Sequence, residues 1–496
     1  MQSSLTRRRL LQGAATFAVA SALPGCSSST TSTPTPPVTS TNPQPTPTGP
    51  LTQASLSVSA TTSGSIGPAF AGLSYEKSTL YEPLFTASNT DLIALFKRLG
   101  TSLLRVGGNS VDRNVWTPNG AGQTVGQIAP SDVSALAAFV KATGWQILYG
   151  INLGGSATGV QTPALAAAEV AYAVQQFGSN LLGIEIGNEC DLYGDSGNYY
   201  AGNWSLAQFE ALWSQYRTTI LATTPSVAIT GPADASNESS WTVPFGKYAT
   251  KSEITLLTQH YYRANGALAT STVEYLVTPD TTLVSNLATL QAGAQSIGIP
   301  YRMSECNSFY NGGSPNVSDA YASALWVIDY LFNLAQGGAT GANFHGGGDS
   351  TGYTPIADSS GVVQDARPEY YGMYFFTLAG TGSLLTTQLT AGGLNATAYA
   401  VKTATGTSLM LVNKDSTQNL TVTAQLPSTI NSASLLAMTQ GPGTPSLSAT
   451  TGVTIQGGTI NPDASFAPQA AYTLTTSGSQ LTCYVPALSA VLISIT

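Results

Sequence analysis

The stretch LLGIEIGNEC, residues 181–190, is an apolar run that ends in Gly-Asn-Glu. Its near-continuous Leu, Ile and Gly content is typical of a strand buried on both faces, as in a parallel sheet. Similar short runs alternate with longer stretches of helical pattern between residues 68 and 380. The predicted strands cover residues 68–76, 103–108, 146–154, 181–189, 228–234, 254–262, 299–307 and 341–346.

Repeated strand and helix units of this number indicate an α/β fold, a (β/α)8 TIM barrel over residues 67–381. Helical patterns fill the gaps, for example at 163–177, 205–223 and 318–336. In such barrels the active site lies at the carboxyl ends of the strands. Polar side chains gather at these predicted strand ends, namely Glu76, Asn109, Asn188, Glu189, His260, Glu305, Asn307 and His345.

The last part of the chain has a different pattern of apolar and polar residues. After about residue 383, apolar positions alternate with Thr and Ser, as in AYAVKTATGTSLMLVNKD at 398–415. This period of two predicts a C-terminal β-sandwich over residues 382–496. Residues 54–65 have the same alternating pattern, so we expect an N-terminal strand at 53–66 to join that sandwich.

Residues 1–26 resemble a bacterial export signal. Three arginines at 7–9 precede an apolar run at 13–23 that is too short to remain as a transmembrane helix, as in a twin-arginine signal. The sequence Leu-Pro-Gly-Cys ending at Cys26 looks like a lipoprotein cleavage box, with Pro24 departing from the usual pattern. We therefore expect an exported protein, periplasmic, at the cell surface or secreted, with Cys26 as a candidate lipid anchor. Residues 27–52 are rich in Ser, Thr and Pro and predict an extended linker.

Composition excludes several classes of partner. Charged residues make up 8% of the chain, and 17 Lys and Arg face 25 Asp and Glu. No basic surface is expected, so neither nucleic acid nor a heavily sulfated polysaccharide is a suitable partner. Cys190, Cys306 and Cys483 predict no disulfide framework, and the two histidines offer no zinc pattern. We therefore expect no metal and no cofactor, and no feature indicates an oligomeric state.

Two glutamates carry the predicted chemistry. Glu189 ends the fourth predicted strand and Glu305 ends the seventh, so they face one another across a closed barrel. This placement allows a carboxyl separation of about 5 to 5.5 Å, the spacing of a retaining glycoside hydrolase. Glu189 is assigned as general acid/base and Glu305 as nucleophile. Either glutamate alone could be a solvated loop carboxylate, and Glu185, two positions deeper, fits a structural carboxylate bound to an inward arginine.

Six segments in order resemble glycoside hydrolase family 79, in clan A. They are FAGLSYEKS at 70–78, LLRVGGNSVD at 103–112, GIEIGNEC at 183–190, TQHYY at 258–262, MSECNSFY at 303–310 and the C-terminal sandwich. The resemblance implies a retaining, metal-free enzyme with Glu189 and Glu305 in the roles given above. It further implies that Asn188 contacts the sugar 2-hydroxyl.

The resemblance also suggests partners for the nucleophile. Arg105 resembles the arginine that orients and ionises it, with an ion pair to Glu185 as the alternative. Tyr261 resembles the tyrosine that donates a hydrogen bond to the nucleophile. Tyr262 is the alternative if the alternation of side chains along the strand is shifted by one residue. For His345 we favour contacts with sugar hydroxyls and for the other histidine, at 260, core packing. Glu76 and Asn109 are further candidate sugar contacts.

Recognition of a glucuronate carboxylate requires donors near the strand ends. Lys77 is one candidate. The segment SFYNGGS, residues 308–314, offers another, in which the Tyr310 hydroxyl and the backbone N–H groups of Gly312 and Gly313 hold the carboxylate. Tyr353 would complete this cradle. The alternative is that the segment is a plain turn, since Asn-Gly and Gly-Gly form turns readily.

These expectations combine into a retaining, exo-acting β-glucuronidase that acts on a glucuronic-acid-containing oligosaccharide or glycoside. A heparanase-like activity would need clustered Lys and Arg, which the sequence lacks. One alternative is another retaining clan A enzyme, a β-xylosidase or β-glucosidase, which needs no carboxylate cradle. From a different class, a tethered carbohydrate-binding protein with an inactive barrel is the second alternative.

Overall fold

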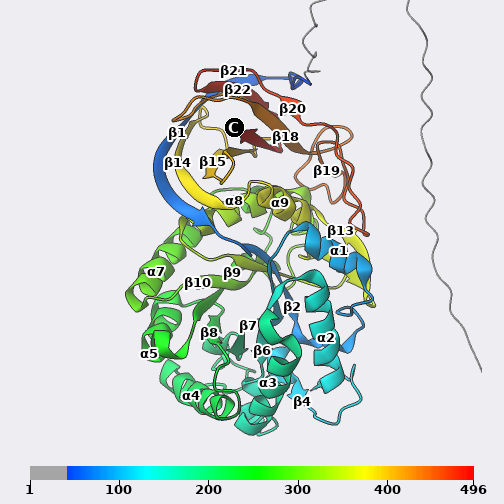
Figure 1. Cartoon of the computed structure of the whole chain (residues 1–496), viewed down its shortest axis with the longest axis vertical. Coiled ribbons are helices and arrows are strands. Elements are labelled where there is room, and N and C mark those ends of the chain that lie inside the picture. The colour runs from blue at the N-terminus through cyan, green and yellow to red at the C-terminus, as the bar shows by residue number, and fades with distance from the viewer. Residues whose placement is uncertain (1–41) are drawn as a thin grey trace, which may run out of the picture. The chain divides into compact units, whose positions relative to one another are not determined.

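The computed structural model describes residues 42–496, so the predicted export signal and Cys26 lie outside the described residues. Eight parallel strands close into a barrel, which confirms the predicted fold class. Each predicted strand overlaps an observed one, and Figure 1 shows helices around the outside. The barrel strands are β2 (Ala71–Glu76), β3 (Leu103–Gly107), β6 (Gln146–Ile151), β7 (Leu181–Ile186), β8 (Ile229–Asp234), β9 (Leu256–Asn265), β10 (Tyr301–Tyr310) and β11 (Ala342–Gly346).

The outer helices begin at local capping signals. The Thr162 hydroxyl accepts a hydrogen bond from Leu165 N–H at the start of α3, and Asp280 caps α7 through Leu283 N–H. Proline in the first turn and a polar cap fix the starts of such helices. The helices are α1 (Thr90–Arg98), α2 (Pro130–Thr143), α3 (Pro163–Phe177), α4 (Leu206–Thr223), α5 (Val243–Glu253), α6 (Val273–Leu276), α7 (Thr281–Ile297), α8 (Tyr321–Gln336) and α9 (Pro368–Thr377).

A large curled sheet of eleven strands follows the barrel in sequence. The N-terminal strand β1 (Leu51–Ile66) lies inside this sheet, antiparallel to β14 and parallel to β17, and Figure 1 shows β1 and β14 curving side by side. The predicted participation of the N-terminal strand is therefore confirmed. The other strands are β14 (Gly382–Thr390), β15 (Ala396–Lys402), β16 (Thr407–Asn413), β17 (Asn419–Gln425), β18 (Ala433–Gln440), β19 (Val453–Ile455), β20 (Tyr472–Thr473), β21 (Thr476–Ser477), β22 (Gln480–Val485) and β23 (Ser489–Ile495).

Two small strand pairs lie in loops: β4 (Val115–Trp116) with β5 (Gln127–Ile128), and β12 (Ile356–Ser359) with β13 (Val362–Ala366). The predicted linker ends earlier than residue 52. Gln44 exchanges side-chain hydrogen bonds with the backbone of Tyr484, and Asn42 donates to Ala470. From Asn42 onward the chain is therefore attached to the sheet, because these amides pair with backbone groups of the C-terminal strands.

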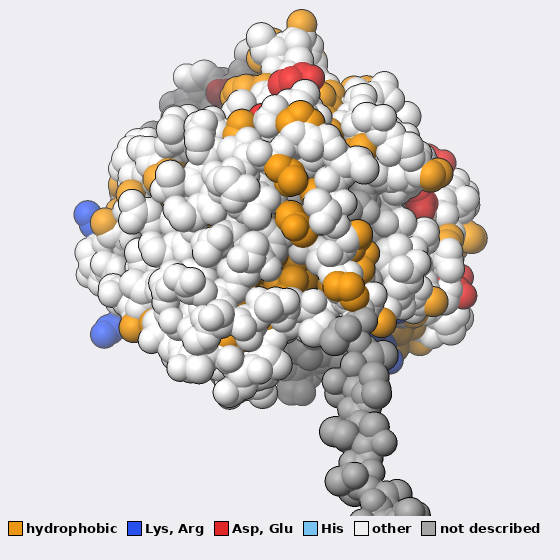
Figure 2. All heavy atoms as spheres, turned by 90° about the horizontal axis from the view of Figure 1, so that it is seen from above, with side chains coloured by type: hydrophobic (Ala, Val, Ile, Leu, Met, Phe, Trp, Pro, Cys, Tyr) orange, Lys and Arg blue, Asp and Glu red, His pale blue; other side chains and the backbone are white. Residues whose placement is uncertain are grey.

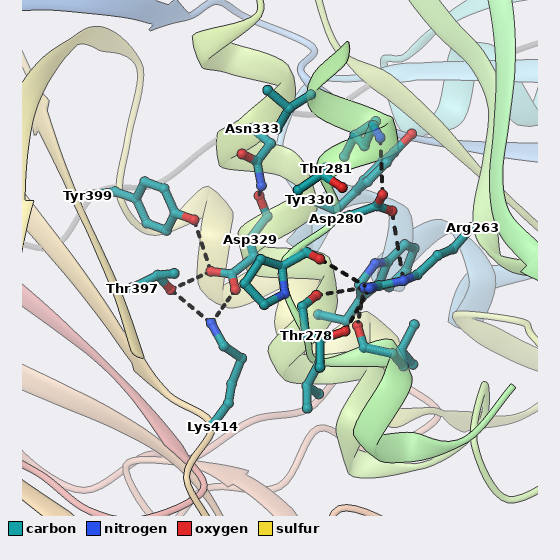
Figure 3. A pocket seen from close by; sticks show the side chains of 16 residues that line it. Arg263, Thr278, Asp280, Thr281, Asp329, Tyr330, Asn333, Thr397, Tyr399 and Lys414 are labelled. Atoms are coloured by element: carbon teal, nitrogen blue, oxygen red, sulfur yellow. Dashed lines mark hydrogen bonds and ion pairs between the residues drawn. The ribbon is translucent and has the colours of Figure 1, made fainter. Parts of the chain in front are cut away.

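A polar network joins α8 of the barrel to the sheet. Asp329 accepts hydrogen bonds from Thr397, at 2.6 Å, and from Tyr399, at 3.0 Å, and forms an ion pair with Lys414. Figure 3 shows these groups converging on Asp329 at the wall of a cavity of about 250 Å³. The Lys414 and Asp329 charges are mostly shielded from water, so the pair fixes how the sheet sits against α8.

The surface has few charges, as the composition predicts. Figure 2 views the molecule from the end where the sheet lies in Figure 1, and most of the side chains in view are uncharged. Within residues 42–496, no helix combines the length and the apolar character needed to cross a membrane.

Candidate active site

The two predicted catalytic glutamates stand at one end of the barrel. Glu305 lies within β10, and Glu189 follows β7 in a left-handed backbone conformation with φ of 49° and ψ of 48°. Its N–H donates to the carbonyl oxygen of Ala233, whose φ of 60° is also positive. Non-glycine residues adopt this conformation at a cost, and such residues cluster at functional sites. The turn aims the Glu189 carboxylate into the barrel mouth.

The carboxylates of Glu189 and Glu305 lie close together. Ligand atoms of these two residues and of His260 are all within 4.8 Å of one another. This close spacing fits a retaining pair, whereas an inverting pair is separated by about 6.5 to 9.5 Å. His260 is buried, as expected, but its Nδ1 also lies 3.1 Å from Oε1 of Glu189, so this histidine contacts the predicted acid/base.

Arg105 makes both of the contacts that the sequence left open. Its Nη1 donates to Oε2 of Glu305 at 2.6 Å, and its Nε donates to Oε2 of Glu185, also at 2.6 Å. Its Nη2 donates to Oδ1 of Asn188 at 2.8 Å. One buried guanidinium therefore orients the predicted nucleophile, the structural carboxylate and the predicted 2-hydroxyl contact together.

The site keeps Glu305 ionised. Burial by itself would raise the pKa of Glu305, but the nearby His345, His260 and Arg105 and a hydrogen bond from Tyr262 hold that pKa well below its usual range. A carboxylate whose pKa is held low is ionised at neutral pH and is therefore suited to act as a nucleophile.

The structure corrects the assignment of Tyr261. Its hydroxyl donates to Oδ2 of Asp280 at 2.6 Å, away from the glutamates, whereas the Tyr262 hydroxyl donates to Oε1 of Glu305 at 2.8 Å. Consecutive strand residues face opposite sides of the sheet, so only one of the two tyrosines can enter the barrel. Tyr262 is the residue that does, together with His260 two positions earlier.

Glu76 and His345 form a second polar group beside Glu305. His345 lies 3.6 Å from Oε2 of Glu305 through Nδ1 and 3.6 Å from Oε1 of Glu76 through Nε2. Burial acts to lower the pKa of His345, but the charges of Glu305 and Glu76 raise it overall. Glu76 accepts hydrogen bonds from the N–H groups of Asn109, at 3.1 Å, and Ser110, at 2.7 Å. Glu76, Asn109 and His345, the predicted sugar contacts, line the same cavity as Glu305.

The glycine segment after β10, which the sequence predicts as a carboxylate cradle, contributes to the cavity wall. Tyr310, Gly312 and Tyr353 line the cavity, and the Tyr353 N–H donates to the Gly312 carbonyl oxygen at 3.1 Å. Gly313 has φ of 87°, and a Cβ there would lie 2.6 Å from the Tyr353 backbone nitrogen. Within residues 42–496 the Gly312 and Gly313 N–H groups donate no hydrogen bond. Of the two glycines, Gly312 lines the cavity.

Lys77 does not reach this wall, which corrects its assignment as a carboxylate partner. It is fully buried, and its Nζ donates to the Gly150 carbonyl oxygen and to Glu169, at 2.7 and 2.5 Å. The chain turns into a short 3-10 helix after Glu76, which directs Lys77 toward α3. Lys77 therefore compensates the buried Glu169 charge and contributes to the fold.

The cavity holds several residues that the sequence reasoning missed. Its volume is about 740 Å³, enough for more than one sugar unit. Besides the residues named above, it is lined by Arg113, Leu192, Asn198, Ala235, Ser236 and Asn311. They lie in loops after β3, β7, β8 and β10 and belong to no recognisable motif; the one available signal was their position shortly after a strand end.

Glu189, His260 and Glu305 are also the group of described residues whose atoms gather as metal ligands would. A divalent cation among them would stand close to the Arg105 guanidinium, which already contacts Glu305. The positive charges of the metal ion and of Arg105 would repel one another. Arg105 also already neutralises the Glu305 carboxylate, which would have to bind the metal. The donor set fits an acid and nucleophile pair better than a metal centre.

Comparisons with known proteins give a consistent result. No protein-family model matches the chain. A β-glucuronidase from Aspergillus niger is 25% identical over 307 residues, which are 54% of this chain and 55% of that relative. The chain thus matches about half the length of this curated relative.

Among solved structures, a 4-O-α-L-rhamnosyl-β-D-glucuronidase from Fusarium oxysporum in complex with Rha-GlcA is similar with a TM-score of 0.72 and 20% identity, over 89% of this chain and 100% of that one. A family 51 α-L-arabinofuranosidase from Bifidobacterium longum has a TM-score of 0.62 and 16% identity, over 90% and 100% of the two chains. At these identities the likeness is one of fold, and the chain shares the barrel and accompanying sheet of several glycoside hydrolases.

Proposed function

We propose that the protein is a retaining glycoside hydrolase that cleaves β-glucuronides. The observation that carries the proposal is the Glu189 and Glu305 pair, with oxygen atoms within 4.8 Å and with Glu305 held by Arg105 and Tyr262. The similarity to a β-glucuronidase from Aspergillus niger supports the substrate class. The six sequence segments support membership of glycoside hydrolase family 79.

The proposed reaction is a double displacement. Glu305 attacks the anomeric carbon while Glu189 transfers its proton to the glycosidic oxygen, so the bond to the aglycone breaks and the aglycone leaves as an alcohol. Glu189, now ionised, takes a proton from water, which attacks the same carbon and releases Glu305. Two inversions give net retention. Asn188, positioned by Arg105, is placed to contact the 2-hydroxyl during these steps.

The glucuronate carboxylate is assigned to the wall formed by Tyr310, Gly312 and Tyr353. Tyr310, with its hydroxyl, and Gly312, whose N–H donates no hydrogen bond within residues 42–496, both line the cavity there. Glu76 and His345 lie beside Glu305, where they meet sugar hydroxyls. The rhamnosyl-glucuronidase of similar fold binds Rha-GlcA, which supports a glucuronide in this site. The N-terminal sequence supports export, with a candidate lipid anchor at Cys26.

The test is hydrolysis of matched nitrophenyl β-glycosides. The protein should cleave the β-glucuronide with a higher kcat/KM than the β-glucoside or β-xyloside, and NMR at early times should show the β-anomer of glucuronic acid. Glu305→Gln should remove nearly all turnover and keep the circular dichroism spectrum. A preference for a neutral glycoside would favour a β-glucosidase or β-xylosidase, and glycan binding without any turnover would favour a binding protein. First appearance of the α-anomer would refute the retaining mechanism.

A further inference from the structure

Arg113 occupies an unusual position in the cavity. The other charged side chains of the lining, apart from His345, are the carboxylates Glu76, Glu189 and Glu305. Arg113 is exposed, and within residues 42–496 no carboxylate lies within ion-pair distance of its guanidinium. Its charge is therefore available to a ligand that enters the cavity.

The backbone around Arg113 is firmly held. The neighbouring Asp112 is buried and accepts hydrogen bonds from Leu153 N–H, at 2.8 Å, and from the Tyr193 hydroxyl, at 2.5 Å. The next residue, Asn114, is buried and donates to the Ser110 carbonyl oxygen at 2.7 Å. A side chain between two anchored neighbours starts from a fixed point, so less entropy is lost when it orders on a ligand.

Arg113 lies on the side of the cavity from which the aglycone leaves. Glu189 protonates the glycosidic oxygen in the proposed reaction, so the aglycone lies over the loop that follows Glu189. Leu192 and Asn198 of that loop line the cavity with Arg113. Arg113 also lies near Tyr199 of the same loop, since burial raises the pKa of Tyr199 and the Arg113 charge works against that rise. The predicted glucuronate contacts, in contrast, follow β10 and β11.

We propose, on the basis of the function given above, that Arg113 selects substrates whose aglycone carries a carboxylate, such as an acidic sugar unit. A guanidinium offers paired donors that match a carboxylate. A single arginine fits one such group, and the lining offers no cluster of cations for a densely sulfated chain. The site would thus recognise two carboxylates of the substrate, that of the glucuronate and that of the aglycone, one on each side of the scissile bond.

The experiment compares two glucuronides that differ only in the charge of the aglycone, 3-carboxyphenyl and 3-carbamoylphenyl β-glucuronide. The measured quantity is the ratio of kcat/KM for the charged substrate to that for the neutral one. We expect Arg113→Gln to lower this ratio by about three- to tenfold relative to the unmodified protein, as for an exposed charge-assisted contact. Arg113→Lys should restore part of the ratio, and raising the salt concentration should reduce it in the unmodified protein only.

Lys402→Gln is the matched control, because it removes the same positive charge from the chain. Lys402 is exposed and lies on β15 of the sheet. That variant should keep the ratio. If Arg113→Gln leaves the ratio unchanged, or lowers kcat/KM for both substrates equally, the aglycone contact is refuted. If the unmodified protein cleaves neither glucuronide, the proposed function itself fails, and the two failures are thereby distinguished.

Discussion

The Tyr262 hydroxyl donates a hydrogen bond of 2.8 Å to Oε1 of Glu305, while Tyr261, one position earlier on β9, donates to Asp280 on the other side of the strand. Tyr262→Phe should therefore lower kcat/KM by about 10- to 100-fold, the value of a hydrogen bond to a charged group. It should also move the acidic limb of the pH profile upward, because that bond helps to keep the pKa of Glu305 low.

Tyr261→Phe removes the same atom from the neighbouring residue and serves as the control. Its effect should fall on thermal stability, with kcat/KM within about twofold of the unmodified protein. Equal losses of kcat/KM in the two variants would contradict the assignment of Tyr262.

Azide should distinguish the two glutamates by the product that forms. In Glu189→Ala the nucleophile remains, so a nitrophenyl glucuronide still forms the covalent intermediate and azide then releases it as the β-glucuronosyl azide. In Glu305→Ala azide takes the place of the nucleophile and gives the α-azide. NMR of the products measures the anomer. The same azide anomer from both variants would show that the roles are wrongly assigned.

The carboxylate wall should be specific for glucuronides. Tyr310→Phe removes a hydroxyl from an exposed side chain that lines the cavity, and it should lower kcat/KM for the β-glucuronide by about 5- to 20-fold while changing the slower β-glucoside reaction little. The control is Tyr248→Phe, at another exposed tyrosine, on α5. Equal losses on both glycosides from Tyr310→Phe would mean that the segment is a turn without a role in recognition.

Glu369 should make stability depend on pH. Burial raises the pKa of Glu369 to about 8, although its Oε2 accepts a hydrogen bond from Asn307, at 3.2 Å. Because this folded-state value lies above the unfolded one, the contribution of the neutral carboxyl to stability is complete below about pH 4 and is lost as the pH rises toward 8.

Glu369→Gln keeps the neutral form at every pH. Relative to the unmodified protein, its free energy of unfolding should increase between pH 5 and pH 8, on the order of 1 to 3 kcal/mol. Thermal melts at the two pH values measure the difference. A gap that is constant with pH would show that Glu369 does not titrate in this range.

The eight barrel strands and both glutamates could be predicted because each depends on local pattern. An apolar run marks a buried strand, and a polar residue at its end marks the mouth of a barrel. Glu189 and Glu305 met both conditions, and their partner Arg105 lay inside a predicted strand.

The errors arose where the structure depends on contacts between distant segments. The register between β9 and β10 pairs Met303 with Gln259 and Glu305 with His260, so one residue is inserted on β10. Which of Tyr261 and Tyr262 faces the barrel depends on the parity of β9, and the sequence left Tyr262 as the alternative because contacts with neighbouring strands set that parity. Lys77 could not be placed either, because its partner Glu169 lies 92 positions away on another helix.

The position of β1 has a consequence for the order in which the chain can fold. This strand is synthesised before the barrel, yet its two neighbours, β14 and β17, begin at residues 382 and 419. Both of its backbone edges stay without their native partners until nearly the whole chain has emerged, and an unpaired edge invites association with other chains. A fragment ending at residue 381 would therefore contain every barrel strand and still expose an aggregation-prone ribbon.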